Sequence, residues 1–394
     1  MRVLAFAFRE DPPISPESEK VEKNMTFLGL TGIIDPPREE VPEAIRRCKK
    51  AGIQVKMVTG DNEDTARAIA ERIDLTDNPR VITGDEMDQM SVEELSEVIE
   101  DVDIYARTHP KNKSQIVKAL QDHGEIVAMT GDGVNDAPAV NNADIGIGMG
   151  IKGTDVTKEA SDMILQDDNF GTIEKAISGG RKIYDNIEKF VTFLLSRNFT
   201  EVILIASILA MIGDFEWLPL GAMQILFLNM IGQTGPGMGL GVDPPDENIM
   251  DRPPRNPNRK LLNQRNLFMI SAMAVTMVLM ASISFYYGWS QGDVDLARTM
   301  AFTSIAVMII VNAYNFRSLE KTIGQFNPFK NKWIILASLI TIPLVLLTLY
   351  YPPLMNLFGN VKLGVREWMI AGGSGLATLI LLEVMKRITN ILDL

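Results

Sequence analysis

The sequence predicts an α/β domain built on a doubly wound parallel sheet, followed by an all-α membrane domain of six helices. Two observations lead to this prediction. Up to about Asn186, short apolar runs alternate with amphipathic helical patterns among charged residues, as in a soluble α/β domain. Beyond Asn186, long apolar stretches dominate the sequence. Each half is therefore interpreted separately.

The composition excludes several kinds of partner and site. The formal net charge is -12 and Lys and Arg are not clustered, which argues against nucleic acid, because phosphate backbones are bound by basic clusters. The single cysteine, Cys48, excludes an internal disulfide, and two histidines are too few for a His/Cys transition-metal site. Cys48 lies in a helical pattern, and we expect it to be a packing residue.

The first residues, MRVLAFAFRE, predict a strand. Their apolar core is too short for a secretory signal, and charged residues follow at once. No beginning of a domain precedes this strand, so we expect the chain to be a fragment of a longer protein.

Strands and helices alternate from Leu28 to about Gly150. The expected strands are LGLTGIID, QVKMVTGD, VDIYART, EIVAMTGDG and ADIGIGMG, and the expected helices are EEVPEAIRRCKKAG, NEDTARAIAERI and KSQIVKALQDHG. This order predicts a doubly wound parallel sheet, in which ligands collect at the carboxyl ends of the strands.

Polar residues fall at those strand ends. Thr59 and Gly60 end one strand and open a helix, where free backbone N–H groups favour a phosphate. Asp132 and Asp136 flank a turn after a very apolar strand, and two carboxylates at such a place suit Mg²⁺. Lys113, just before a helix, could place a positive charge on the same phosphate. Taken alone, TGD is a common helix N-cap and a lone lysine is usually a solvated surface residue.

Six segments are apolar over about the 20 residues that a helix needs to cross the hydrocarbon core of a bilayer. An alternative is that they are buried helices of a large soluble protein, but the links between them alternate in charge, as in membrane proteins. The segments are Phe190 to Ile212, Trp217 to Val242, Leu267 to Trp289, Thr299 to Phe316, Trp333 to Tyr351 and Trp368 to Met385.

Basic residues follow the second, fourth and sixth segments, whereas the other links are acidic or nearly neutral. By the positive-inside rule the basic links are cytoplasmic, so both chain ends are expected in the cytoplasm. The prediction is a multi-pass protein of the lipid bilayer, in the plasma membrane if the organism is prokaryotic. The basic residues are Arg252, Arg255, Arg259 and Lys260, then Arg317, Lys321, Lys330 and Lys332, then Lys386 and Arg387.

Polar residues inside the segments are candidate ion ligands, because ionisable groups in a membrane are costly and usually functional. Asn198 and Glu201 lie one turn apart, so both can face the same way. Asn229 and Gln233 form an i,i+4 pair where the run GQTGPGMGLG begins, and this run is expected to loosen the helix and free carbonyls for a cation. For the amides, interhelical hydrogen bonding is an equal alternative. Glu201 is expected to lack a Lys or Arg partner nearby and therefore to bind a cation or a proton.

The segment TGDGVNDAPA, with IDPPR, MVTGD, RTHPKNKSQIV and PPDENIMDRPPR in order, resembles the C-terminal part of P-type cation-transporting ATPases of the calcium-pump branch. The resemblance covers almost the whole chain. Their phosphorylation domain has a haloacid-dehalogenase-like fold, which agrees with the predicted sheet. The resemblance implies a nucleotide-binding-domain tail (1–24), a phosphorylation domain lacking its DKTGT segment (25–185) and a membrane domain (186–394).

The resemblance also implies roles for individual residues, with ATP and Mg²⁺ as cofactors. Asp132 would hold Mg²⁺ and Asp136 would support it at an aspartyl phosphate, so that both count as metal residues. The catalytic group would be Lys113, Asp132, Asp136 and Thr59. Contacts with ATP or phosphate are implied for Arg2, Thr59, Gly60, Asp61, Arg107, Lys113 and Asn135. The transported cation would be bound by Asn198, Glu201, Asn229 and Gln233.

The sequence departs from the family in two respects. It has no DKTGT, the motif that holds the family's nucleophile, and no counterpart of the actuator domain or the first four membrane helices. Without the nucleophile, this chain alone is not expected to turn over ATP. In addition, Gln233 replaces an aspartate, Gly232 a threonine and Ile309 the glutamate of two-calcium members. Ca²⁺ is the first expectation, and Mn²⁺ or a monovalent cation stays open.

Three functions are therefore considered. The first is the C-terminal part of an ATP-driven cation pump that works through an aspartyl phosphate and is completed by the missing N-terminal part. The second is a catalytically incomplete split-gene subunit or remnant that depends on another chain. The third is a dehalogenase-type phosphatase, against which the absence of a nucleophile argues.

Overall fold

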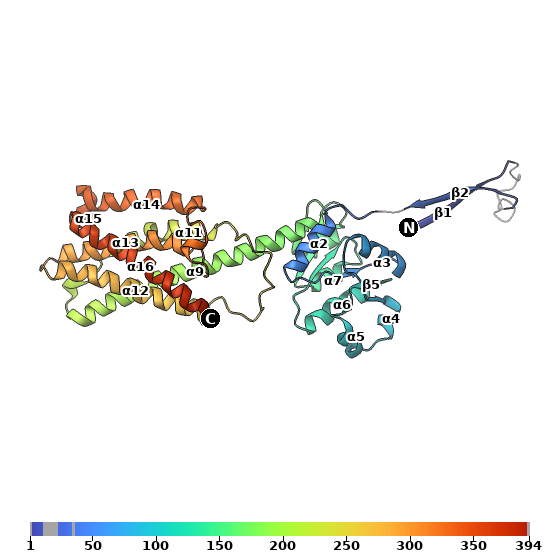
Figure 1. The fold of residues 1–394 in the computed structure, drawn as a ribbon, viewed down its shortest axis with the longest axis horizontal. Coiled ribbons are helices and arrows are strands. Elements are labelled where there is room, and N and C mark those ends of the chain that lie inside the picture. The colour runs from blue at the N-terminus through green and yellow to red at the C-terminus, as the bar shows by residue number, and fades with distance from the viewer. Residues whose placement is uncertain (1, 11–22, 34–35, 392–394) are drawn as a thin grey trace. The chain divides into compact units, whose positions relative to one another are not determined.

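The computed structural model describes residues 2–10, 23–33 and 36–391 (Figure 1). These residues divide into two compact units. The first comprises Met1–Ile177 with Met250–Pro257, and the second comprises Ser178–Ile249 with Asn258–Leu394.

The first two strands form an antiparallel ribbon. Strand β1 (Arg2–Phe8) pairs with β2 (Thr26–Ile33), with a register shift between Phe6 and Ala7. Both strands were predicted, but the assignment of β2 to the parallel sheet is wrong. Its hydrogen bonds go to β1, and pairing over such a distance in sequence cannot be deduced from a local apolar pattern. The proposed boundary at residue 24 stays a prediction.

The predicted parallel strands are confirmed, and they form two separate sheets. One sheet has the order β3-β5-β4 and the other β6-β7-β8, with every pairing parallel. Strands β4 and β8 were not predicted. The bounds are β3 (Met57–Val58), β4 (Val81–Thr83), β5 (Ile104–Ala106), β6 (Ala128–Gly131), β7 (Ile145–Met149) and β8 (Met163–Leu165).

Strand β5 shows why this unit is covered by helices on both faces. Ile104 and Ala106 pack in a cluster with Ile45 and Ala66, which come from the helices before it. Tyr105 points to the opposite face and packs with Met87, Leu95 and Ile116, which come from other helices. Successive side chains of a strand alternate between the two faces, so an uninterrupted apolar strand is buried on both.

The helices of the first unit have clear sequence signals. Asn62 caps α3, and Thr83 and Ser91 form capping boxes at α4 and α5. Cys48 on α2 is buried, which confirms it as a packing residue. The helices are α2 (Val41–Lys50), α3 (Glu63–Arg72), α4 (Gly84–Gln89), α5 (Val92–Val98), α6 (Pro110–Asp122), α7 (Ala137–Asn142) and α8 (Asp155–Glu159).

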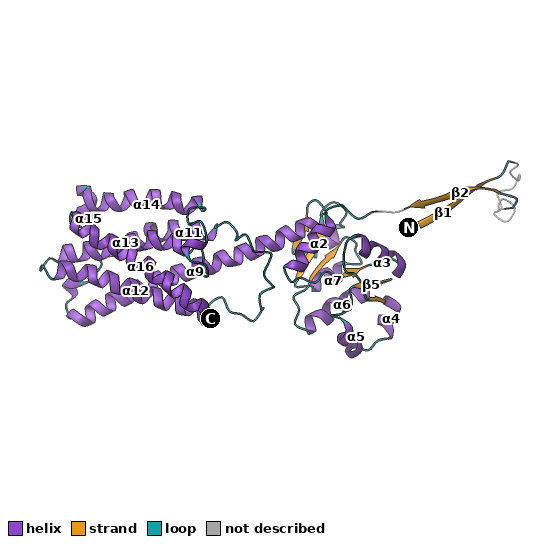
Figure 2. Cartoon of the chain, in the orientation of Figure 1, coloured by secondary structure: helices purple, strands orange, loops and turns teal. Residues whose placement is uncertain are grey.

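The second unit is helical, and the described residues contain six helices long and apolar enough to cross a membrane, as predicted (Figure 2). The second is composite, with a π-helical segment between two α-helices. The bounds are α9 (Phe170–Ile212), which begins in the first unit, η1 (Phe215–Trp217), α10 (Ala222–Phe227), η2 (Leu228–Gln233, π-helical), α11 (Thr234–Gly241), α12 (Gln264–Trp289), α13 (Val294–Asn315), η3 (Ile323–Gln325), α14 (Lys332–Tyr350), α15 (Pro352–Phe358) and α16 (Val365–Ile391).

Small residues bring α12 and α13 into close contact. A Cβ atom added at Gly288 of α12 would lie 2.3 Å from the backbone nitrogen of Ala297 on α13. Ala297 itself is fully buried. Small residues at such crossings let helix backbones approach in a membrane, where van der Waals packing drives association.

We predict that Gly288→Ala destabilises the helical unit by about 1–3 kcal/mol, because the methyl group would overlap backbone atoms of α13. The matched control is Gly373→Ala on α16, where an added Cβ would meet nothing within 4 Å. Thermal unfolding of the two variants in detergent provides the comparison. Equal midpoints for both variants would contradict the proposed close contact.

Candidate functional site

The turns after β3 and β5 are joined at the carboxyl edge of their sheet. The N–H of Arg107 donates to the Asp61 carbonyl at 2.8 Å, and the N–H of Thr108 donates to the Thr59 carbonyl at 3.0 Å. These bonds bring Thr59, Gly60, Asp61 and Arg107 together, as the predicted phosphate contacts require. Next to them lies a hollow of about 400 Å³, lined by Gly60, Asn62, Asp85, Arg107, Thr108 and His109.

Arg107 has a backbone φ of 50°, in the left-handed region that residues other than glycine rarely adopt. Such conformations cost free energy and persist where the surrounding structure enforces them. Here the hydrogen bonds of Arg107 and Thr108 to the preceding turn enforce it, so the backbone at this edge is held in one arrangement.

A part-buried ion pair organises the turn after β6. The Nζ atom of Lys113 donates to Oδ1 of Asp136 at 2.5 Å. The other oxygen, Oδ2, accepts the backbone N–H groups of Asp132 and Gly133, each at 3.2 Å. Burial alone would raise the pKa of Asp136, but the bonds from Lys113 and the backbone outweigh it and hold the pKa below its ordinary value.

Glycine is required at the end of β6. A Cβ atom added at Gly131 would lie 2.5 Å from Cβ of Asp136 and 2.8 Å from a methyl group of Val140. The absence of a side chain therefore lets Asp136 approach the strand end and reach the turn.

The two predicted Mg²⁺ residues have different environments. Asp132 is exposed, whereas Asp136 is buried and both its oxygens already accept hydrogen bonds. Exposed carboxylate oxygen is what Mg²⁺ prefers, so the residues fit the ion with Asp132 as its ligand and Asp136 positioning the turn. That both Asp132 and Asp136 act at a metal ion stays a prediction. Within the described part of the chain, no group of three or more His, Cys, Asp or Glu could hold a metal.

The remaining residues predicted to contact phosphate or ATP in this unit are Lys113, Asn135 and Arg2. Lys113 lies inside α6 and not before it, because Pro110 begins the helix three residues earlier. Asn135 is exposed in the turn between Asp132 and Asp136. Arg2 begins β1, but its side chain lies outside the described residues.

In the second unit, Glu201 has a basic partner, which corrects the prediction. Nη1 of Arg197 donates to Oε2 of Glu201 at 2.8 Å, one turn earlier on α9. Nδ2 of Asn229 donates to the same oxygen at 3.2 Å, so two of the predicted ion residues, Glu201 and Asn229, do meet. Arg197 could have been found from the sequence, because residues i and i+4 of a helix are neighbours.

Asn198 differs from Glu201 in burial, and its role as an ion ligand stays a prediction. Asn198 is exposed, whereas the buried face of α9 includes Phe193, Arg197, Glu201 and Leu204. Residues three apart differ by about 60° around a helix, and residues four apart by about 40°. Asn198 therefore lies beyond the edge of the buried face.

The second span is loosened where its glycine-rich run begins, and most of the run is α-helical. Residues Leu228–Gln233 form a π-helical segment, and the following Thr234–Gly241 is α-helical. Single π-helical turns are rare and frequently occur at functional sites. Gln233 ends this segment and is buried, and its Oε1 has no hydrogen-bond partner among the described residues.

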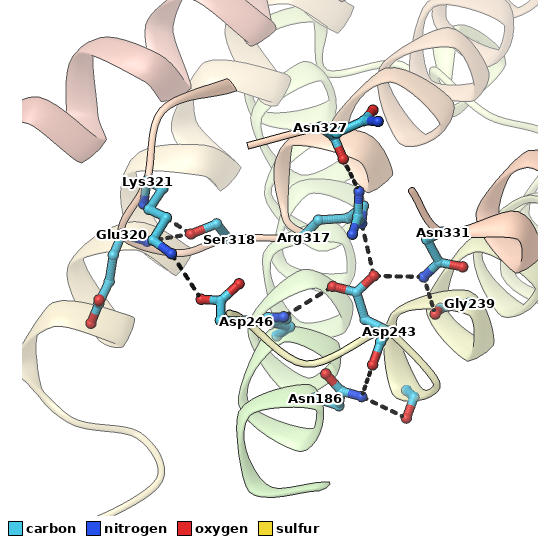
Figure 3. Close-up of polar contacts among 12 residues, drawn as sticks. Asn186, Gly239, Asp243, Asp246, Arg317, Ser318, Glu320, Lys321, Asn327 and Asn331 are labelled. Atoms are coloured by element: carbon cyan, nitrogen blue, oxygen red, sulfur yellow. Dashed lines mark hydrogen bonds and ion pairs between the residues drawn. The ribbon is translucent and has the colours of Figure 1, made fainter. Parts of the chain in front are cut away.

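A buried polar cluster ties four helices together, and the sequence did not predict it. Asp243, after α11, pairs with Lys189 of α9 at 3.0 Å and with Arg317, after α13, at 2.7 Å. Nδ2 of Asn331, which caps α14, donates to Asp243 at 2.8 Å, and Nδ2 of Asn186 donates to its carbonyl at 2.9 Å (Figure 3). Arg317 was interpreted only as a loop charge. The sequence signal that could have indicated this cluster is that residues of opposite charge flank the same ends of three spans.

We predict that Asp243→Ala destabilises the helical unit by about 3–5 kcal/mol, because Lys189 and Arg317 would be left buried without a counter-charge. The control is Asp246→Ala, whose part-exposed pair with Lys321 at 3.5 Å should contribute about 0–1 kcal/mol. Thermal unfolding in detergent measures both. Similar losses in the two variants would show that the cluster does not hold the helices.

The chain is similar to two families and to longer transport proteins. The model of haloacid dehalogenase-like hydrolases matches residues 6–144, and the model "Cation transporting ATPase, C-terminus" matches residues 217–388. A calcium-transporting ATPase of Bacillus subtilis is 42% identical over 97% of this chain and 43% of its own length. Calcium-transporting ATPase 1 of Bacillus cereus is 40% identical (98% and 45%), and calcium-transporting ATPase type 2C member 1 of Homo sapiens is 39% identical (92% and 40%). The chain thus spans less than half the length of these curated relatives.

Proposed function

Because this chain belongs to the P-type cation-transporting ATPases, in their calcium-pump-like branch, we propose that it is the C-terminal part of an ATP-driven cation pump. The pump would work through an aspartyl phosphate. The observation that carries the proposal is the Lys113–Asp136 ion pair beneath the exposed Asp132, at the carboxyl end of a parallel strand. This is where open α/β sheets bind their ligands.

The residues at this edge have complementary roles in phosphoryl transfer. When bound at Asp132, Mg²⁺ would neutralise charge on the transferred phosphoryl group. Asp136 holds the backbone of Asp132 and Gly133 and thereby orients the metal ligand. Lys113 neutralises Asp136 and lies within reach of the same turn. Thr59, Gly60, Asp61, Arg107 and Asn135 would contact phosphate or ATP, as would Arg2 from the ribbon.

The phosphate-accepting aspartate would come from a segment outside this sequence. Strands β3 and β6 are each an edge strand of their sheet, and each is followed directly by a proposed site residue, Thr59 after β3 and Asp132 after β6. In β6, the side chains of Ala128 and Thr130 are exposed, although the sequence around them is apolar. Unpaired strand edges are a liability, so a strand that pairs between β3 and β6 would cover both. We propose that this strand carries the DKTGT aspartate.

The same N-terminal part would supply the actuator domain and four further membrane helices. A split-gene subunit, dependent on a second chain, is the alternative. Both arrangements place the protein in the lipid bilayer with its two ends in the cytoplasm, and in a prokaryote in the plasma membrane. The DNA upstream of Met1 separates them: an in-frame DKTGT supports one continuous pump, and a stop codon supports two chains.

The transported cation would bind where α9 meets the π-helical segment. Glu201, Asn229 and Gln233 supply oxygen ligands there, and Asn198 would face helices outside this sequence. Oxygen ligands suit hard cations, and the relatives are named as calcium-transporting ATPases. Ca²⁺ is therefore the proposed ion, with Mn²⁺ and monovalent cations as the alternatives to test.

We predict that Asp132→Ala in the complete pump lowers the rate of cation-dependent, acid-stable phosphorylation from ATP by about 100-fold or more, because the metal ligand is lost. The control is Asp122→Ala, an exposed carboxylate at the end of α6. Ca²⁺, Mn²⁺, Na⁺ and K⁺ are supplied separately. Phosphorylation that none of these cations stimulates, or that Asp132→Ala leaves intact, would contradict the proposed function.

A further inference from the structure

The guanidinium group of Arg197 lies in a setting that the proposed pump does not explain. Its side chain is 1% exposed in the apolar part of α9, and its described ion-pair partner is Glu201, at 2.8 Å. Ionisable groups in a membrane span are costly and rare, and those that occur usually serve a function. A positive charge next to the one proposed carboxylate ligand for a cation therefore needs an explanation.

The contact uses only a small part of the hydrogen-bonding capacity of the guanidinium and the carboxylate. A guanidinium binds a carboxylate best through two parallel hydrogen bonds, yet only Nη1 of Arg197 donates to Glu201. Nε and Nη2 of Arg197 and Oε1 of Glu201 find no hydrogen-bond partner among the residues that the structure describes. Buried donors and acceptors without partners are destabilising. Stability alone thus gives little reason for this pair.

Arg197 also does not join α9 to another helix through a described hydrogen bond. The link to the second span is made by Asn229, which donates to Oε2 of Glu201 at 3.2 Å. A variant that removes only the guanidinium keeps this link. Asn229 therefore makes the hydrogen bond between the two helices, and the charge of Arg197 must serve a different role.

Arg197 competes with a cation for the same oxygen. Oε2 of Glu201 already accepts from Arg197 and Asn229, and a metal ion that bound there would meet the positive guanidinium. The Arg197–Glu201 pair has no net charge, whereas Glu201 alone has one negative charge. A nearby like charge disfavours a bound cation just as it disfavours a bound proton. The orphaned Oε1 of buried Gln233 offers a further oxygen but no charge.

We propose that Arg197 is a resident counter-charge of the ion site, which neutralises Glu201 when no cation is bound and must leave it for a metal cation to bind. Arg197 would thereby set the cation affinity and disfavour divalent ions. The inference rests on the proposed function, since it needs Glu201 to be an ion ligand.

The test uses the complete pump and measures the Ca²⁺ concentration that gives half-maximal acid-stable phosphorylation, with Mn²⁺ in parallel. Arg197→Met keeps the length of the side chain and removes its charge, and it should lower this concentration by about tenfold or more. Arg197→Lys keeps the charge and should stay within about threefold of the unmodified pump. A merely structural role would not increase the affinity.

A second comparison remains informative if the single variant fails to fold. Arg197→Met combined with Glu201→Gln removes both charges, and replacing a whole buried pair is often tolerated. Glu201→Gln alone leaves Arg197 without a counter-charge, so it should need more Ca²⁺ than the double variant. Equal values for these two variants would overturn the inference.

The outcomes separate the inference from the proposed function. A half-saturating concentration that Arg197→Met leaves unchanged or raises, in a pump that is still phosphorylated, overturns the inference alone. An unmodified pump that no cation phosphorylates contradicts the proposed function and the inference with it.

Discussion

A charge buried among apolar helices has to meet an opposite charge, and this constraint shapes the helical unit at Asp243 and at Glu201. Asp243 lies between Lys189 of α9 and Arg317 after α13, so that one carboxylate neutralises two groups that are far apart in sequence. Glu201 is neutralised by Arg197 on its own helix. The first arrangement satisfies its partners with additional amide hydrogen bonds and fixes the helices. The second leaves donors and acceptors unpaired, which suits a site that changes partners.

In the first unit, too, a buried charge is neutralised by an opposite charge, at the proposed phosphate site. Asp136 is buried because Lys113 neutralises it, and the ion pair in turn holds the backbone of the turn that presents Asp132. In the proposed site, the exposed carboxylate of Asp132 would bind the metal and the buried Asp136 would hold the turn in place. Among the described residues, β3 and β6 are edge strands of their sheets, and the proposed additional strand would complete the packing and the site together.

Local patterns predicted much of the fold. The wrong predictions concern contacts between residues far apart in sequence and details of side-chain geometry. The six spans and the strand ends follow from apolar length and period, which are local properties. The pairing of β2 with β1, and the meeting of Asp243 with Arg317, join residues whose proximity no local pattern encodes. Arg197 was predictable, because a basic residue at i−4 is in reach of a helical carboxylate.

The central claim is that charge compensation at Glu201 governs cation binding, and structures of the complete pump without and with saturating Ca²⁺ test it most directly. Without the cation, the account predicts that Nη1 of Arg197 lies within hydrogen-bond distance of Glu201, as it does here. With Ca²⁺, it predicts that Glu201 and Asn229 coordinate the ion and that Arg197 has moved away. A bound Ca²⁺ with the Arg197–Glu201 contact still intact would contradict the account.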